Sequence, residues 1–484
     1  MGKFGLAPFA LLVAAALNAC GGGSGNATEY DYEVVDTVRG SSSVEVIRDT
    51  VYEHEEQEHD VYPPTGLDSL SQAEELSSSS LYLLPSSSSF WEISSSSVMD
   101  PPSSSSQESS SSLNNEPLSS SSKEPRSSSS KKPVQNFSFY TGADISTVQE
   151  YERWGAKFYD VDGSEKDVFT LLKDHGFNAI RLKTFVSPKA QYGYAATGCD
   201  HDAEAYADKD HIVAYAQKIK AAGMAFLLDI HYSDNWADPG KQIIPSRWRS
   251  VTSSDAMADS VYNYTYDLLS ALKQVGATPT MVQVGNETTP GILMHVPNSS
   301  TNCWGDGVDK APTSVGGDMS TNAGKANAAK YFKAGIRAVK AVSQDIRTVL
   351  HIESIRKPNT VNWWMNEIFK NQKVPADVMG FSAYTAYDDG PPNNWVNLFK
   401  SLSSSYPDLE FIVAEYNGGD TKDHYSFDGS RKRTNEMVRG LDRWIGTFFW
   451  EPTLSGAWGA PLFDWDGPNL RANKDAFEEY KVEF

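Results

Sequence analysis

Two glutamates stand where short apolar runs end, and both are candidates for acid–base or nucleophilic chemistry. Glu287 closes the run MVQVGNE (residues 281–287), directly after Asn286, and Glu415 closes the run FIVAE (residues 411–415). The surroundings of a buried carboxyl group can keep it protonated, as an acid, or ionised, as a nucleophile. Two such groups facing each other suit the cleavage of a glycosidic bond, in which one protonates the leaving oxygen and the other attacks the anomeric carbon.

Other polar or aromatic residues also follow apolar runs: Asp144, Arg181, Asp229, His231, Glu353, Tyr384, Trp450 and Glu451. By position alone, Glu353 and Glu451 are rivals of the two favoured glutamates. Metal catalysis is usually marked by paired histidines or clustered ligands. Here only His231 lies close in sequence to acidic residues, Asp229 and Asp234. The sequence therefore predicts no catalytic metal.

Eight short apolar runs, typical of buried parallel strands, must position these residues. They are Phe139–Ile145, Ala179–Lys183, Ala225–Tyr232, Met281–Glu287, Thr348–Ser354, Val378–Tyr384, Phe411–Tyr416 and Thr447–Trp450. Amphipathic helical stretches such as 165–174 and 328–342 lie between them. This alternation predicts an α/β fold, a single (β/α)8 TIM barrel. A doubly wound open sheet is less favoured, because no Gly-rich phosphate loop follows the first run.

A barrel of this kind gathers the carboxyl ends of its strands at one face, where active sites lie. Glu287 would end the fourth strand and Glu415 the seventh, on opposite sides of the ring, so the two carboxyl groups could face each other across a sugar. The alternative for either glutamate is a structural ion pair with Arg181 or a charge at the rim.

The first 20 residues indicate an export signal. Lys3 precedes an apolar run, residues 6–17, which is too short to span a membrane stably but has the length of a signal-peptide core. The segment LNACGG (residues 17–22) resembles the bacterial lipoprotein signal, in which the cysteine is lipidated. We expect Cys20 to anchor an exported lipoprotein at the outer membrane or cell surface. A buried free cysteine behind an ordinary signal is the alternative.

Residues 21–135 predict a disordered acidic and Ser-rich linker. They contain seven blocks of four serines, separated by short spacers with Pro, Glu and Asn. Small polar residues cannot offset the entropy lost on ordering. Residues 136–484 then form the single folded domain.

Charge and cysteine content restrict the partners further. The formal net charge is −21, which argues against a nucleic-acid partner and against adsorption to an anionic membrane, so a lipid anchor would be the only membrane contact. Cys199 and Cys303 could form a disulfide in an oxidising compartment, and their spacing does not indicate a metal site. A monomer is the expected state.

Several motifs resemble glycoside hydrolase family 53, the endo-β-1,4-galactanases of the retaining (β/α)8 clan. They are TGADIS (141–146), KFYDVDG (157–163), NAIRLK (178–183), LDIHYSDNWADPGKQ (228–242), MVQVGNE (281–287) and FDWDG (463–467). The resemblance runs from about Tyr140 to Phe484, and the run from Asp229 to Gln242 is its most specific part.

The resemblance implies a role for each matching residue. Glu287 would be the general acid/base and Glu415 the nucleophile. Arg181 and His231 would support the nucleophile and the sugar, and Asn286 would reach the hydroxyl next to the anomeric carbon.

These roles imply distinct environments for the two glutamates. Arg181 near Glu415 would favour the charged form of that carboxyl, while burial would raise the pKa of Glu287. The two carboxyl groups would lie roughly 5–5.5 Å apart, which predicts net retention.

Trp236, Tyr384, Trp450 and Trp458 are candidates for stacking on sugar rings, and Asp144 either binds substrate or holds the shape of the site. No cofactor is expected to be required. A structural calcium ion near Asp420, Asp423 and Asp428 is left open.

Three loops depart from the family pattern: TTPGILMH (288–295), AYTAYDDG (383–390) and YNGGD (416–420). Because they face the substrate, two alternatives to galactan hydrolysis stay open. One is a retaining endo-hydrolase of the same clan acting on xylan, mannan or β-glucan. The other is a non-catalytic glycan-binding lipoprotein.

Overall fold

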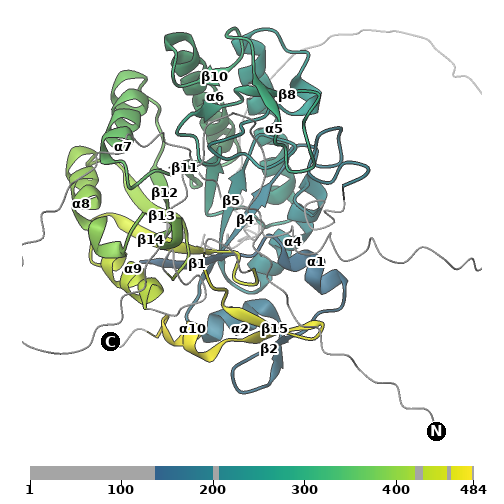
Figure 1. Ribbon diagram of the computed structural model, residues 1–484, viewed down its shortest axis with the longest axis vertical. Coiled ribbons are helices and arrows are strands. Elements are labelled where there is room, and N and C mark those ends of the chain that lie inside the picture. Colours follow the sequence, from purple (N-terminus) through teal and green to yellow (C-terminus); the bar gives the residue numbers. More distant parts are fainter. Residues whose placement is uncertain (1–136, 200–205, 388, 420–428, 455–458, 482–484) are drawn as a thin grey trace, which may run out of the picture. The chain divides into compact units, whose positions relative to one another are not determined.

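The computed structural model describes residues 137–199, 206–387, 389–419, 429–454 and 459–481. Within them, eight parallel strands close into a barrel, and β14 returns to pair with β1 (Figure 1). The predicted (β/α)8 barrel is confirmed. In chain order the barrel strands are β1 (Tyr140–Asp144), β4 (Ala179–Thr184), β5 (Ala225–Ile230), β6 (Met281–Val284), β11 (Arg347–Ile352), β12 (Val378–Ala383), β13 (Glu410–Tyr416) and β14 (Trp444–Trp450).

Some sequence-based predictions fall outside the described residues and stay predictions. They concern the export signal (1–20) with Cys20, the linker (21–135), Trp458, and the group Asp420, Asp423 and Asp428.

Successive side chains of each barrel strand point alternately to the helices and to the barrel interior. On β5, Phe226 and Leu228 belong to the large outer core, whereas Ala225 and Leu227 belong to a second apolar cluster that fills the barrel. Toward the carboxyl ends, the same inward-facing rows turn polar. Arg181 follows Ala179 in this way, and the alternation therefore sets an apolar floor beneath a polar site.

Helices flank the barrel strands in Figure 1, and several begin with side-chain caps. Asp208, Ser253 and Thr321 accept hydrogen bonds from main-chain N–H groups in the first turns of α4, α5 and α6. The helices are α1 (Val148–Arg153), α2 (Val168–Asp174), α4 (Lys209–Ala221), α5 (Ser254–Gln274), α6 (Asn322–Val342), α7 (Pro358–Met365), α8 (Val396–Ser405), α9 (Ser430–Arg439) and α10 (Lys474–Glu478). A π-helical turn, Asn366–Asn371, continues α7, and 3₁₀ turns occupy Ser246–Trp248, Thr385–Tyr387 and Pro392–Asn394.

Three small sheets accompany the barrel. One has the order β15-β16-β2-β3, and β10 pairs with β7 and β8 with β9. Their strands are β2 (Phe158–Tyr159), β3 (Glu165–Lys166), β7 (Gly291–Ile292), β8 (His295–Pro297), β9 (Val308–Lys310), β10 (Gly317–Asp318), β15 (Phe463–Asp466) and β16 (Asn469–Ala472).

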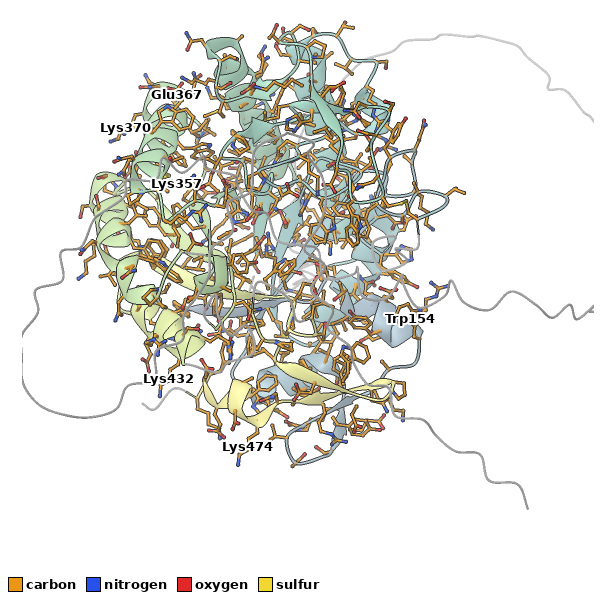
Figure 2. All side chains as sticks on the ribbon, viewed as in Figure 1. Trp154, Lys357, Glu367, Lys370, Lys432 and Lys474 are labelled. Atoms are coloured by element: carbon orange, nitrogen blue, oxygen red, sulfur yellow. A yellow bond between two sulfur atoms is a disulfide. The ribbon has the colours of Figure 1, made fainter. Side chains whose placement is uncertain are left out.

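A disulfide joins Cys199 to Cys303, the two cysteines that the sequence left available for pairing. It ties the loop after β4 to the loop between β8 and β9. At the surface, Trp154 projects into solvent after α1 (Figure 2) and packs against Tyr151, which also contacts Trp465. Within the described ranges, no helix is both long and apolar enough to cross a membrane.

Candidate active site

Glu287 lies just beyond β6, on a backbone that turns sharply into the barrel mouth. Gly285 has φ +92°, and Glu287 itself has φ +46°, a left-handed conformation that is uncommon for a residue with a side chain. The main chain is fixed there because Thr288 donates both its N–H and its hydroxyl to the carbonyl of His351, at 2.9 and 2.8 Å. The half-buried Glu287 side chain is therefore presented by a constrained turn.

Glu415 reaches the interior because β13 carries an irregularity. Val413 pairs with Phe381, but Glu415 rather than Ala414 pairs with Ser382, so the register shifts by one residue. Ala414 belongs to the apolar cluster inside the barrel, and strict alternation would turn Glu415 outward. The bulge reverses this orientation, as bulges near active sites often do.

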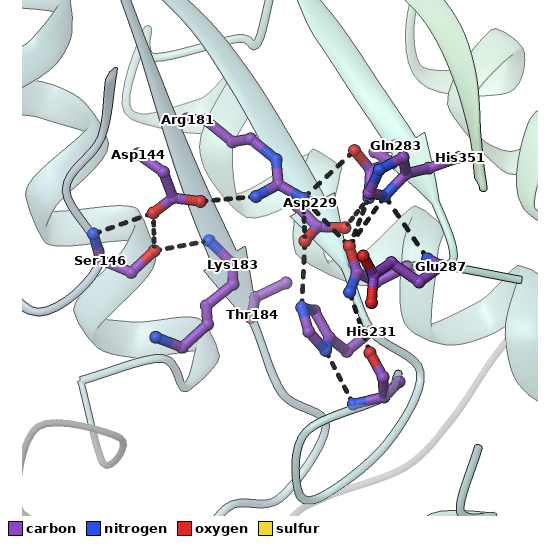
Figure 3. Close-up of polar contacts among 12 residues, drawn as sticks. Asp144, Ser146, Arg181, Lys183, Thr184, Asp229, His231, Gln283, Glu287 and His351 are labelled. Carbon is purple, nitrogen blue, oxygen red and sulfur yellow. Dashed lines mark hydrogen bonds and ion pairs between the residues drawn. The ribbon is translucent and has the colours of Figure 1, made fainter. Parts of the chain in front are cut away.

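Arg181 is the centre of the charged network (Figure 3). Its Nη1 lies 2.7 Å from Asp144, and its Nη2 lies 2.8 Å from Asp229, as Figure 3 shows. Nη2 also lies 2.7 Å from Glu415. All four side chains are almost completely buried. Burial by itself would lower the pKa of Arg181, but Asp229, Glu415 and Asp144 raise it above its ordinary value, so the guanidinium stays charged.

The environments of the two glutamates differ. Burial raises the pKa of Glu415 above its ordinary value, although Arg181 and a hydrogen bond of 3.0 Å from the Tyr384 hydroxyl oppose the increase. Burial also raises the pKa of Glu287, in this case well above its ordinary value, and the charges of Glu415 and Glu353 raise it further. Glu415 therefore ionises first, and Glu287 holds its proton to higher pH.

Arg181 is one of several groups that set the pKa of Glu415. The sequence predicted that Arg181 would favour the charged form of Glu415, and the guanidinium does act in that direction. The pKa of Glu415 is nevertheless raised. Loss of hydration and the nearby charges of Asp229 and Asp144 have a larger effect than Arg181, the cation that all three carboxyl groups share. The expected increase in the pKa of Glu287 agrees with the structure.

The structure brings Asn286 and His231 into the same network, where both bind protein groups. The Asn286 carbonyl oxygen accepts from Arg181 at 3.0 Å, and its amide donates to the carbonyl of Ala237 at 2.9 Å. His231 Nδ1 accepts from the N–H of Ala237, so its Nε2 donates to Asp229 at 3.0 Å. These contacts fix the loop after β5, and direct binding of sugar by the two side chains stays a prediction.

Asp144 is likewise bound by protein donors on both oxygens. One oxygen accepts from Arg181, and the other accepts from the N–H and hydroxyl of Ser146 at 3.1 and 2.6 Å. Of the two roles considered from the sequence, this geometry favours holding the shape of the site.

Three of the four predicted stacking residues form one aromatic wall. Trp450 contacts Trp236 at 6.2 Å and Tyr384 at 6.4 Å between ring centroids. The Lys183 ammonium lies 4.3 Å from the Trp236 ring centroid and 3.5 Å from Glu451. Tyr384 binds Glu415, so this wall lies beside the nucleophile candidate. Trp236 and Trp450 are partly exposed.

The sequence reasoning missed four side chains of this site: Lys183, Gln283, His351 and Ser382. Gln283 donates to Asp229 at 2.5 Å and lies 3.1 Å from His351. The available signal was a polar residue within an otherwise apolar strand, on the inward-facing row. Glu353, which the sequence suggested only as a rival glutamate, is a third carboxyl near Glu287, and burial raises its pKa to about 7.

The arrangement provides one carboxyl whose pKa is raised well above its ordinary value, a second carboxyl bound by Arg181 and Tyr384, and an aromatic wall beside them. These are the functional groups needed for acid-assisted nucleophilic substitution at a sugar carbon. Among the described residues, no group of three or more His, Cys, Asp or Glu side chains is placed to hold a metal ion.

Comparison with known proteins identifies the family. The protein-family model described as glycosyl hydrolase family 53 matches residues 140–478, well over half of the chain. The chain belongs to glycosyl hydrolase family 53. It resembles the solved family 53 catalytic domain of Ignisphaera aggregans, with 28% identity, a TM-score of 0.57, and coverage of 72% of this chain and 98% of that one.

Two curated relatives extend the comparison of this family 53 chain. An uncharacterised protein of Niallia circulans is 34% identical over 51% of the chain, and an arabinogalactan endo-β-1,4-galactanase of Cellvibrio japonicus is 32% identical over 57%. The matches span 59% and 65% of the lengths of these relatives.

The Arg181 network of the family 53 site leads to a stability prediction. Arg181→Met should lower the free energy of unfolding by about 3–5 kcal/mol, because it leaves buried carboxylates without their cation. Urea unfolding at pH 7 measures this. Arg471→Met is the control, since its pair with Asp466 is half-exposed and should contribute only about 0–1 kcal/mol. Equal losses in the two variants would contradict the central role of Arg181.

Proposed function

We propose that this protein is an endo-β-1,4-galactanase that hydrolyses galactan or arabinogalactan side chains of pectin by a retaining double displacement. The observation that supports this most is the difference between the two glutamates. Glu415 lies 2.7 Å from Arg181 and accepts from Tyr384, whereas the pKa of Glu287 is the higher of the two. Membership of family 53 and the Cellvibrio japonicus galactanase support galactan as the substrate.

In the first step, an ionised oxygen of Glu415 attacks the anomeric carbon. The bond from that carbon to the glycosidic oxygen breaks, and Glu287 transfers its proton to this oxygen as the leaving chain departs. The products are a glycosyl ester on Glu415 and an ionised Glu287. Arg181 and Tyr384 hold the attacking carboxylate in position.

In the second step, Glu287 acts as a base. It removes a proton from a water molecule, whose oxygen attacks the anomeric carbon and displaces Glu415. The sugar keeps its β configuration, and both carboxyl groups return to their starting states. This mechanism predicts a separation of roughly 5–5.5 Å between the two carboxyl groups.

The location and partners are also part of the proposal. The sequence of residues 1–20 supports an exported bacterial lipoprotein, attached through Cys20 at the outer membrane or cell surface. The Ser-rich segment 21–135 would then act as a linker to the catalytic domain. We propose a monomer that binds polysaccharide and requires no cofactor.

Product release from purified β-1,4-galactan, beside xylan, mannan and β-glucan, tests the activity. We expect oligosaccharides from galactan, with newly formed reducing ends in the β configuration by NMR. Release from another polymer instead would show that the loops 288–295 and 383–390 have changed the substrate. Binding to galactan without release of products would support the non-catalytic alternative.

A further inference from the structure

Two residues connect the main chain of Glu287 to its own carboxyl group. The N–H of Glu287 points to Nδ1 of His351 at 3.4 Å, and Nε2 of His351 lies 3.0 Å from the Ser382 hydroxyl. That hydroxyl donates to Oε1 of Glu287 at 2.6 Å. Figure 3 shows His351 beside Glu287. We call His351 and Ser382 the Glu287 clamp.

The direction of these hydrogen bonds follows from the donors. Burial, aided by the charge of Arg181, lowers the pKa of His351 well below its ordinary value, so the ring is neutral and carries one proton. The main-chain N–H of Glu287 can only donate, and we therefore assign Nδ1 as its acceptor and Nε2 as the protonated nitrogen. Asn286 Oδ1 lies 2.9 Å from Nδ1 and accepts from Arg181, so in this assignment no hydrogen bond joins it to the ring.

With the proton on Nε2, His351 donates a hydrogen bond to the hydroxyl oxygen of Ser382. The hydroxyl oxygen of Ser382 accepts this bond, and its single hydrogen forms the hydrogen bond to Glu287 Oε1. A carboxyl oxygen that accepts such a bond is a poor place for a proton. The proton of a neutral Glu287 is therefore directed to Oε2.

We propose that His351 and Ser382 are positioning residues for the acid/base: they fix the left-handed backbone of Glu287 and leave Oε2 to exchange the proton. The inference rests on the proposed function, since it assigns these residues to the glutamate that must act first as an acid and then as a base. The same bond to Oε1 persists in both states, so the carboxyl group does not need to rotate between the two steps.

Several charged groups face Glu287 and, together with the clamp, set the pKa of its carboxyl group. Glu415 on β13, Glu353 after β11 and Asp238 after β5 all raise the pKa of Glu287, whereas the Ser382 hydroxyl lowers it. Arg181 approaches from β4 but pairs with Asp144, Asp229 and Glu415. Removing the hydroxyl must therefore raise the pKa of Glu287 further.

The test compares Ser382→Ala with wild-type enzyme on β-1,4-galactan across pH. We expect kcat to fall about 10- to 100-fold, the scale of losing one hydrogen bond to a charged group. The alkaline limb of kcat/KM should move to higher pH, which a purely structural loss would not cause. Ser382→Thr keeps the hydroxyl and should restore the wild-type limb. Ser403→Ala, which removes a buried hydroxyl bonded to Trp444, is the matched control and should leave the limb unchanged.

A double-mutant comparison tests the two residues as a unit. His351→Ala should slow the reaction as Ser382→Ala does, and the double variant should be little worse than either alone. An unchanged alkaline limb in Ser382→Ala, or independent, multiplying losses in the double variant, would overturn the clamp. If wild-type enzyme does not hydrolyse galactan, the proposed function fails first, and the same profiles are then measured on the polymer that is cleaved.

Discussion

Glu415→Ala is expected to reduce kcat on galactan by at least about 10⁴-fold, because it removes the carboxylate that forms the glycosyl ester. The carboxylate of Glu415 is bound by Arg181 and Tyr384, and the substitution removes the attacking atom while both supporting side chains remain. Initial rates of reducing-sugar release from galactan, at matched protein concentration, measure the effect.

A chemical rescue assigns the role of Glu415. With a 2,4-dinitrophenyl β-glycoside of galactobiose and added azide, the azide ion can occupy the space of the lost carboxylate and attack the anomeric carbon directly. The product expected from Glu415→Ala is the α-glycosyl azide. Glu410→Ala, at the other end of β13 in a partly exposed pair with Arg347, is the matched control and should retain activity. Near-normal activity in Glu415→Ala would refute its assignment as nucleophile.

Glu287→Gln is expected to lower kcat/KM on galactan by about 10²- to 10⁴-fold, the usual contribution of a general acid. The loss should be much smaller for formation of the glycosyl ester from a 2,4-dinitrophenyl glycoside, because that leaving group departs without a proton. Azide should then yield the β-glycosyl azide, the opposite anomer to that from Glu415→Ala. Equal losses on both substrates would contradict the role of Glu287 as the acid.

The pH dependence has a defined sign. As pH falls through the raised pKa of Glu415, the nucleophile is protonated and activity declines. As pH rises through the pKa of Glu287, which lies well above its ordinary value, the acid is lost and activity declines again. Glu287→Gln should remove this alkaline decline. Glu353, with a pKa of about 7, titrates nearby and should broaden the limb in the wild type.

The same raised pKa predicts a stability effect of Glu287→Gln. A folded-state pKa above the unfolded value means that the folded state binds the proton more tightly, so stability falls as pH rises from the unfolded to the folded pKa. The Gln variant has no such loss. Thermal unfolding should give it a higher Tm than wild type at alkaline pH and a similar Tm near pH 4. The reverse order would contradict the raised pKa.

The sequence determined the barrel and much of the site by itself. Eight apolar runs, separated by amphipathic helices, leave few other ways to bury their surface, and the carboxyl ends of parallel strands then meet at one face. For this reason Arg181 and Glu415 could be assigned to one site from their places in the pattern, although they lie far apart in the chain. The sequence also placed Glu287 at the site, because it directly follows the apolar run that begins at Met281.

The tertiary structure alone decided how Glu415 enters the site. Alternation along β13 would have sent it outward with Val413, and only the register shift against β12 turns it inward beside Arg181. Such a bulge depends on how a strand pairs with its neighbours, which the sequence of that strand does not record.

The tertiary structure also decided the electrostatics. The sequence indicated that Arg181 would favour an ionised Glu415. It could not show that the cation is shared with Asp144 and Asp229, or that all of these side chains are buried. The pKa of a buried group depends on the combined effect of all the residues around it. A sequence motif identifies only some of those residues. The Glu287 clamp was hidden for the same reason: His351 and Ser382 are single polar residues on two different strands, and the closed barrel is what brings both to Glu287.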